Sequence, residues 1–180
     1  MKITDEKRYD KAKKELDKKP QSKAKICELL KEALEKGNIR GTVQEVKLSE
    51  LKNLEIPKTK IDNLNSMLFI QFTRNGYIAV VGAGNDCVKN PLYNKRGKTG
   101  EILARLREKD ASYKFEFDVD SVIVVLLENV ESRGYNKASS ILQCRNGLEQ
   151  YIGEYLESNE VPILNYYQHW NYRKSVKEYD

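Results

Sequence analysis

The sequence predicts an α+β protein in which a small antiparallel or mixed sheet is flanked by helices and preceded by a helical N-terminal region. Three observations support this. Apolar residues recur at helical spacing early in the chain, two β-rich runs flank an Asn-Gly pair, and the apolar run "DSVIVVLL" stands between two further helical patterns. We divide the chain into a basic helical region, residues 1–66, and an α+β domain, residues 67–180.

The N-terminal region begins with a charged segment, residues 1–21, which predicts a loose or peripheral helix. An amphipathic helix follows, because its apolar residues fall at i, i+3, i+4, i+7 and i+8. Ser22 can cap the start of this helix and Gly37 can end it. The residues expected on its buried face are Ile26, Leu29, Leu30, Ala33 and Leu34.

The positive charge of the chain is concentrated in its first 40 residues. They hold thirteen Lys or Arg against eight Asp or Glu, an excess of five, and the net charge of the whole chain is +5. Such a surplus indicates either a solvated helix face or a surface that binds nucleic acid. The sequence leaves both readings open.

Residues 49–54 predict a short helix, and a second helix is expected after Pro57 with Ile61, Leu64 and Leu68 facing inward. A helix, a turn and a helix are the parts of a helix-turn-helix, although any small helical bundle has the same pattern. The outward-facing residues, which are the candidate nucleic-acid contacts, are Lys58, Lys60 and Asn63.

From residue 67 the predicted order of elements is β-β-α-β-α. An antiparallel hairpin should span residues 67–82 and turn at Asn75-Gly76, because Asn-Gly is the strongest short-range hairpin signal. A polar loop should lead to a helix over residues 99–109. Strand 121–127 is apolar enough to be central in its sheet, and a last helix is expected over residues 138–157.

Gly97-Lys98-Thr99 matches the end of a phosphate-binding P-loop, G-x-x-x-x-G-K-[ST]. Position 92, where the first glycine of that motif would stand, is Leu. The segment also follows a polar loop rather than a buried strand. The sequence therefore argues against nucleotide hydrolysis.

Cysteine and histidine usage argue against other classes of site. The three cysteines are too widely spaced for a zinc motif or a disulfide framework, and His169, the only histidine, would have to serve any triad alone. No apolar run approaches about 18 residues, and the first residues do not resemble a signal peptide. We expect a reduced, cytoplasmic protein without membrane contact.

A hairpin, a helix reading "ARLREK", an apolar strand, the helix "NGLEQYIGEYL" and then "VPILN" form a specific order. This order resembles the GIY-YIG nuclease superfamily, nearest its type II restriction-enzyme branch, over roughly residues 67–165. The resemblance implies that Arg105 is the helix arginine, Glu149 the metal-binding glutamate and Asn165 the late asparagine. A fixed guanidinium can neutralise a phosphodiester transition state, and a carboxylate can hold Mg²⁺ or Mn²⁺.

The chain departs from the family at three positions. Phe69 and Val80 stand near the two motif tyrosines, and Lys109 replaces the histidine four residues after the arginine. Phe69 and Val80 cannot activate water, whereas Lys109 could contact phosphate or act as a base. Tyr77 and Tyr93 are nearby phenols that could substitute. The polar loop and the start of the following helix add the candidate nucleic-acid contacts Lys95, Arg96 and Lys98.

Each of these residues also has a purely structural reading. Arg105 and Lys109 could be solvated helix residues, Glu149 could form a helical ion pair with Arg145, and Asn165 could belong to a turn. The favoured function is Mg²⁺- or Mn²⁺-dependent cleavage of DNA or RNA. The alternative is a catalytically degenerate binding protein of phage or mobile-element origin, which would bind nucleic acid or counter a host nuclease ribonucleoprotein.

Overall fold

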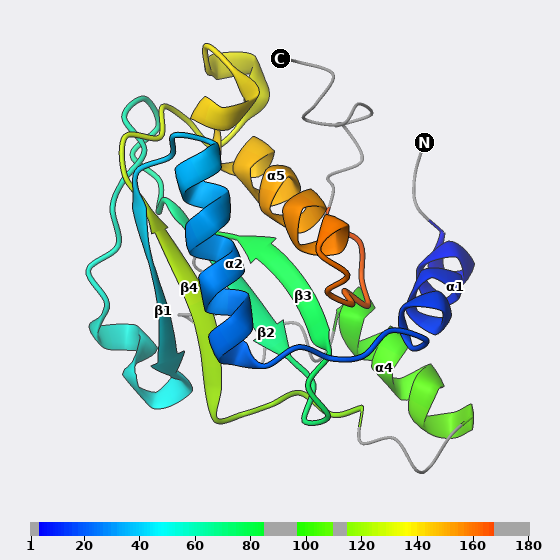
Figure 1. Cartoon of the computed structure of the whole chain (residues 1–180). Helices are drawn as coiled ribbons and strands as arrows, with labels where there is room; N and C mark the ends of the chain where they lie inside the picture. The colour runs from blue at the N-terminus through cyan, green and yellow to red at the C-terminus, as the bar shows by residue number, and fades with distance from the viewer. Residues whose placement is uncertain (1–3, 85–96, 110–114, 168–180) are drawn as a thin grey trace.

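The computed structural model describes residues 4–84, 97–109 and 115–167 (Figure 1). It contains a four-stranded antiparallel sheet in the order β1-β4-β2-β3. The strands are β1 (Gly41–Lys47), β2 (Met67–Phe72), β3 (Ile78–Ala83) and β4 (Ser121–Leu127). The predicted fold class, an α+β sheet flanked by helices, is confirmed at this level.

Helices α2 (Lys23–Lys36) and α5 (Arg145–Ser158) cover one face of the sheet, as Figure 1 shows. The side chain of Ser22 accepts the N–H of Lys25 and caps α2, and Gly37 follows its last residue. All five residues predicted for the buried face of α2 lie in the largest core, with apolar side chains of α5 and the sheet. The prediction for this helix is therefore confirmed.

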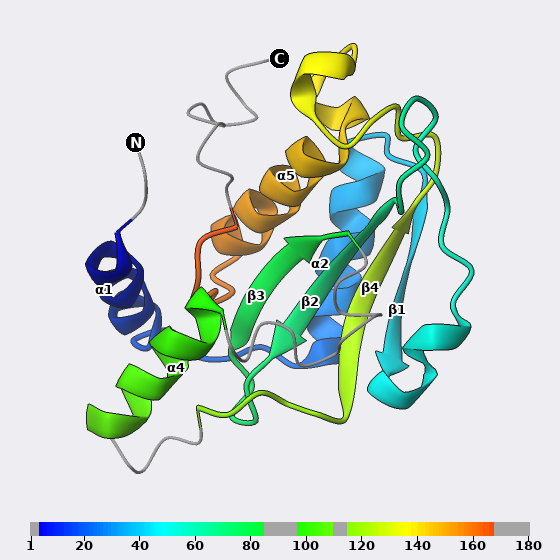
Figure 2. The same ribbon diagram turned by 180° about the vertical axis from the view of Figure 1, so that it is seen from behind.

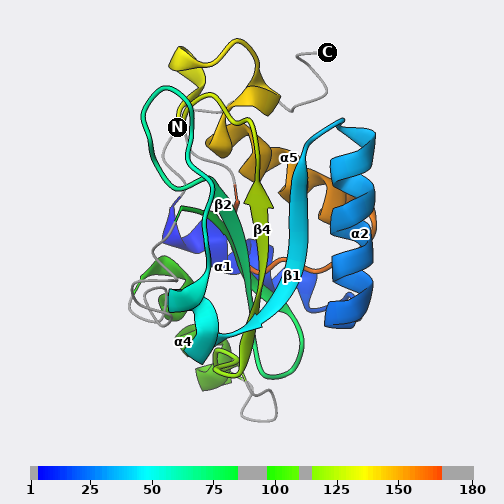
Figure 3. The ribbon, with the colours of Figure 1, turned by 90° about the vertical axis from the view of Figure 1, so that its left-hand side faces the viewer.

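The opposite face of the sheet is covered by the short 3-10 helix η1 (Leu48–Asn53), visible in the edge-on view of Figure 3. Leu51 of η1 is 1% exposed and packs with apolar side chains of all four strands. This second core contains Phe69 of β2 and Val80 of β3. The region that connects β1 to β2 therefore supplies the cover for this face.

Beyond strand β3, helices α1 (Asp5–Glu15) and α4 (Lys98–Lys109) pack on each other (Figure 2). Tyr9 and Ala12 of α1 are buried against the apolar face of α4, which is formed by Ile102, Leu103 and Leu106. The charged N-terminal segment thus forms a helix at the periphery of the sheet with a firmly packed inner face. No helix in the described part of the chain is long and apolar enough to cross a membrane.

The prediction of a helix after Pro57 is wrong, so the second helix of the expected helix-turn-helix is not present at residues 57–66. Residues 57–66 form a loop, closed by a bridge between Lys58 and Asn65. The Thr59 hydroxyl accepts the N–H of Leu64 at 2.9 Å, and Asn63 has a φ of 49°, a left-handed conformation that asparagine tolerates. These local hydrogen bonds replace the helical ones, and Ile61 is 57% exposed.

Strand β1 was not predicted, and it changes the domain organisation. All seven of its residues pair with β4, from Gly41 with Leu127 to Lys47 with Ser121. The boundary placed at residue 66 therefore falls inside one sheet. The alternation in "TVQEV" is short and partly polar, because β1 is an edge strand with one side exposed.

The hairpin and the strand after it agree with the prediction. Strands β2 and β3 pair across the turn at Asn75-Gly76, and β4 pairs with β2. The last helix is shorter than predicted, because residues 141–143 form the 3-10 helix η4 and α5 begins only at Arg145. Cys144 has an extended backbone and is the N-cap of α5, because its sulfur accepts the N–H of Gly147 in the first turn.

Candidate functional site

Arg105, the predicted catalytic arginine, is held by helix α1. Its Nη2 lies 3.2 Å from a carboxylate oxygen of Glu6, and its guanidinium lies 3.9 Å from the centre of the Tyr9 ring. Tyr9 is 2% exposed. Both contacts come from α1 and hold the arginine at the interface between α1 and α4.

The other predicted cations of α4 lie at the same interface. Lys98 pairs with Asp5 at 3.1 Å and with Glu101 at 3.2 Å, and the hydrogen bond with Asp5, followed by that with Glu101, raises the pKa of Lys98. The Lys109 ammonium lies 5.3 Å from the centre of the Tyr9 ring. Lys98 and Lys109 both contact side chains of α1 and contribute to its packing.

Asn165, the predicted late asparagine, connects three segments of the chain. Its Oδ1 accepts from Arg8 at 2.8 Å, and its Nδ2 donates to the Thr99 hydroxyl at 2.7 Å. Asn165 is 6% exposed. This amide thus joins α1, α4 and the segment after α5, which is a structural role available without any ligand.

Glu149, the predicted metal ligand, lies on α5 and is 6% exposed. Helix α5 contacts strands β2 and β3, whereas the contacts described above for Arg105 come from α1. Convergence of Arg105 and Glu149 on one phosphate stays a prediction. Within residues 4–84, 97–109 and 115–167, no group of three or more His, Cys, Asp or Glu side chains could hold a metal ion.

Phe69 and Val80 stand near the motif tyrosines of the resembled family, and they lie on the same face of the sheet. They are 4% and 8% exposed and pack in the core beneath Leu51 of η1. The Phe69 ring also fills the space beside Gly82, where an added Cβ would come within 2.3 Å of it. This part of the face is apolar and covered, so Phe69 and Val80 offer no group that could move a proton.

Tyr77, one of the two phenols predicted to substitute for the motif tyrosines, is not accessible. Tyr77 is 5% exposed, and its hydroxyl donates to backbone carbonyls of the α1–α2 connection, those of Leu16 and Lys18. Tyr77 therefore anchors that connection. The predicted site residues Tyr93, Lys95 and Arg96 lie outside the described residues.

A different set of polar residues comes together where two loops meet. We call residues 57–66 and 130–140 the loop end; both lie at the same end of the sheet in Figures 1 and 2. The N–H groups of Lys60 and Ile61 donate to the carbonyls of Val130 and Glu131 at 2.9 and 2.8 Å, and the N–H of Arg133 donates to Asp62 at 3.0 Å. These hydrogen bonds make one continuous surface from two loops that are far apart in sequence.

The basic side chains of the loop end outnumber its carboxylates by four to two. None of these basic residues forms an ion pair with another described residue. They are all exposed, and they are Lys58, Lys60, Arg133 and Lys137. Asn63, the third contact predicted in this region, is exposed on the same loop.

The two carboxylates of the loop end are engaged in holding the loops. Burial by itself raises the pKa of Asp62, but hydrogen bonds from the Thr59 hydroxyl and from backbone N–H groups outweigh it, and the pKa is lowered overall. Hydrogen bonds from the N–H and the hydroxyl of Ser139 lower the pKa of Glu131. Both acids are therefore ionised at neutral pH.

Apolar and aromatic side chains are exposed among these cations. Ile61 is 57% exposed, Leu64 38% and Tyr135 40%. The prediction identified Lys58, Lys60 and Asn63 but missed Tyr135, Arg133 and Lys137. Their signal is the segment "SRGYNK", in which basic residues flank an aromatic one, a pattern typical of nucleic-acid-binding surfaces.

Comparisons with known proteins give no family for this chain. No protein-family model matches the sequence, no curated protein matches it, and no solved structure matches the fold. The resemblance to GIY-YIG nucleases therefore rests on the residues and the element order given above.

Proposed function

We propose that this protein has a GIY-YIG-like fold and binds single-stranded DNA or RNA through the loop end without cleaving it. The observation that carries the proposal is the presence of four exposed cations, without ion-pair partners among the described residues, around the exposed Tyr135. Phosphates would pair with these cations, and release of the counterions of the phosphates would favour binding.

The exposed apolar groups of the loop end favour a single strand over a duplex. Unpaired bases can stack on an aromatic ring, and such stacking contributes about 1–3 kcal/mol per base. Tyr135 offers a ring for one base, and Ile61 and Leu64 offer apolar contacts beside it. Because the loops are joined by backbone hydrogen bonds, little ordering is required when a ligand binds.

The contacts of the family positions support binding without cleavage. Arg105 is engaged by Glu6 and Tyr9, and Asn165 by Arg8 and Thr99. Phe69 and Val80 are buried beneath η1. A nuclease would need a general base, a guanidinium and a metal-holding carboxylate around one phosphate. The contacts of Arg105 and Asn165 support packing roles for these two residues.

Fluorescence anisotropy with labelled oligonucleotides of about 20 bases tests the binding. We expect the wild-type protein to bind single-stranded DNA or RNA more tightly than a duplex of the same length. Lys60→Ala and Arg133→Ala should each weaken binding, and Tyr135→Ala should weaken it by the loss of about one stacked base, about 1–3 kcal/mol. Lys31→Ala, which removes an exposed lysine of α2, is the matched control and should change nothing.

The same oligonucleotides, incubated with Mg²⁺ and with Mn²⁺, test the absence of cleavage. Intact strands after long incubation are the expected result. Cleavage by the wild type that Glu149→Gln abolishes would instead establish the metal-dependent nuclease. If the protein neither binds nor cleaves any strand, the alternative function remains, an inhibitor whose partner is a protein such as a host nuclease.

A further inference from the structure

A separate cavity of about 440 Å³ lies between helix α4 and the chain segment that precedes strand β4. Leu103 of α4 lines it on one side, and Phe117 and Val119 line it on the other. Its volume falls within the range of small-molecule pockets, about 300–1,000 Å³. Leu103 and Phe117 are largely buried in the wall, whereas Val119 is 46% exposed and offers the accessible apolar surface.

The walls of this cavity are held by backbone hydrogen bonds. The N–H of Arg74 donates to Glu116 and the N–H of Asp118 donates to Phe72, both at 2.8 Å. Residues 116–118 thereby continue the sheet beyond the end of β2. The cavity wall opposite α4 is therefore a hydrogen-bonded extension of the sheet.

Two arginines line the cavity with a single carboxylate. Arg74 pairs with Glu116 at 3.2 Å, and both of these side chains are about half exposed. Arg107 donates from Nη1 to the carbonyl of Phe115 at 2.5 Å, and no described carboxylate forms an ion pair with it. The carbonyl holds the guanidinium in place, and the lining keeps a net charge of +1.

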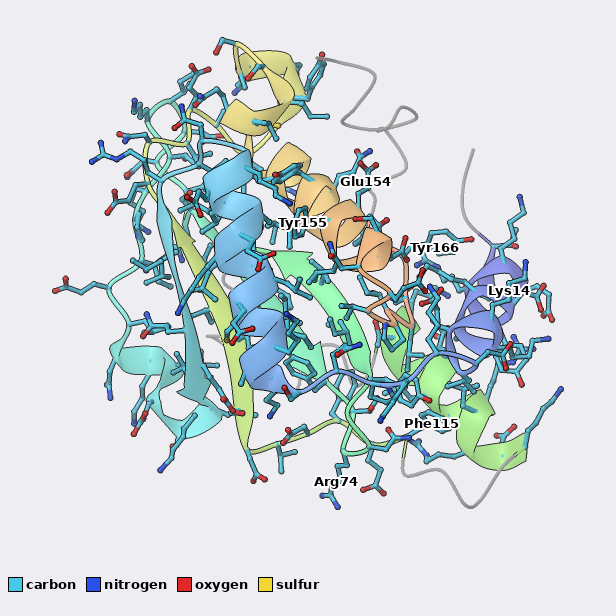
Figure 4. All side chains as sticks on the ribbon, in the orientation of Figure 1. Lys14, Arg74, Phe115, Glu154, Tyr155 and Tyr166 are labelled. Atoms are coloured by element: carbon cyan, nitrogen blue, oxygen red, sulfur yellow. The ribbon has the colours of Figure 1, made fainter. Side chains whose placement is uncertain are left out.

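We propose that this cavity binds a small organic anion, with a phosphate or carboxylate group at Arg107 and Arg74 and a flat apolar body against Leu103, Phe117 and Val119. A guanidinium fork matches both kinds of anionic group. The site is distinct from the loop end: Figure 4 shows Arg74 and Phe115 at the opposite end of the sheet. The proposal does not depend on nucleic-acid binding.

Titration of ¹⁵N-labelled full-length protein with phenyl phosphate and, separately, with benzoate tests the site by NMR. We expect saturable shifts of the amide signals of Gly100, Ala104 and Val119 with at least one of the two, and the better ligand identifies the anionic group. Inorganic phosphate lacks the apolar body and phenol lacks the charge, so each should bind at least about tenfold more weakly. Equal binding of inorganic phosphate would overturn the proposal, because only charge would then matter.

Two variants locate the ligand. Arg107→Ala should weaken binding about 10- to 100-fold, which corresponds to one lost hydrogen bond to a charged group. Ala104→Trp should fill the cavity and abolish binding while the spectrum keeps the dispersion of a folded protein. Arg40→Ala, which removes an exposed arginine outside this cavity, is the control. Unchanged affinity of the Ala104→Trp protein, or no saturable shifts in the wild type, would rule the site out.

Discussion

The guanidinium of Arg105 lies 3.9 Å from the centre of the buried Tyr9 ring, so the arginine that the family resemblance assigned to catalysis stacks on helix α1. Glu6 adds an ion pair from one turn earlier in α1. A cation over an aromatic face is attracted by the ring quadrupole, and it also shields the ring from water. The contact explains how a strongly charged helix such as α1 can dock on α4.

Arg105→Ala should therefore affect stability and leave nucleic-acid binding unchanged. We expect a loss of about 0.5–1 kcal/mol in the free energy of unfolding, as for a cation–π contact near the surface. In a Tyr9→Leu background the same substitution should cost less, because the ring is gone. Urea unfolding of the four proteins measures this coupling. Equal costs in both backgrounds, or weaker binding of single strands by Arg105→Ala, would contradict the packing role.

Gly82→Ala should destabilise the protein because the new Cβ would meet the Phe69 ring at 2.3 Å. Overpacking of this kind costs about 1–3 kcal/mol. Phe69→Leu should relieve part of that cost in the double variant. Gly134→Ala is the control, since its Cβ would lie 3.2 Å from a flexible side chain, that of Asn136. Thermal unfolding measures the loss of stability in each variant. Equal losses for Gly82→Ala and Gly134→Ala would refute the close packing of Phe69 against Gly82.

Lys23 links α2 to the start of β4, and this link should make stability depend on pH. Its ammonium lies 2.5 Å from Asp118 and 2.7 Å from the hydroxyl of Ser121. Burial alone raises the pKa of Asp118, but the hydrogen bonds from Lys23 and from the Asp120 N–H help to lower it overall, below the ordinary 3.8. A carboxylate with a lowered pKa stabilises the fold above its unfolded pKa, and this contribution is lost as the pH falls through the folded pKa.

Asp118→Asn should accordingly be less stable than the wild type at pH 6, and the difference should shrink below about pH 4. Urea unfolding at pH 6 and at pH 3 measures it. Asp17→Asn, which changes an exposed carboxylate on the α1–α2 connection, serves as the matched control. A difference between Asp118→Asn and the wild type that is the same at both pH values would show that the ion pair with Lys23 does not carry the effect.

The elements that could be predicted are those specified by residues close together in the sequence, such as caps, turn residues and regularly spaced apolar residues. The spacing of apolar residues and the Ser22 cap specified α2, and Asn75-Gly76 specified the hairpin. Strand β1 could not be found in this way, because its pairing with β4 joins residues about 80 positions apart and its exposed side reads as polar loop. The helix predicted after Pro57 failed because the Thr59 hydroxyl bonds the local backbone in competition with a helix.

The candidate site was predictable only as a set of residue types. Lys58 and Lys60 were identified, but their supposed helix gave them the wrong neighbours. Only the folded chain brings them next to Arg133 and Lys137, through hydrogen bonds between residues 60–62 and 130–133. The roles carried over to Arg105 and Asn165 could not be judged from sequence either, because their partners, Glu6, Tyr9 and Arg8, lie about 100 residues or more away.

The central claim is that the loop end binds the phosphates of a single strand, and the salt dependence of binding tests it most directly. The affinity of the wild type should be compared, from low to moderate salt, with that of the variant Lys58→Ala, Lys60→Ala, Arg133→Ala, Lys137→Ala. Each phosphate contact contributes about 0.7 to the slope of log affinity against log salt for single strands, so the four substitutions should flatten the slope by up to about 3. A control that removes four exposed cations elsewhere, at Lys25, Lys31, Lys47 and Lys52, should keep the wild-type slope. Identical slopes for the wild type and the loop-end variant would contradict the claim.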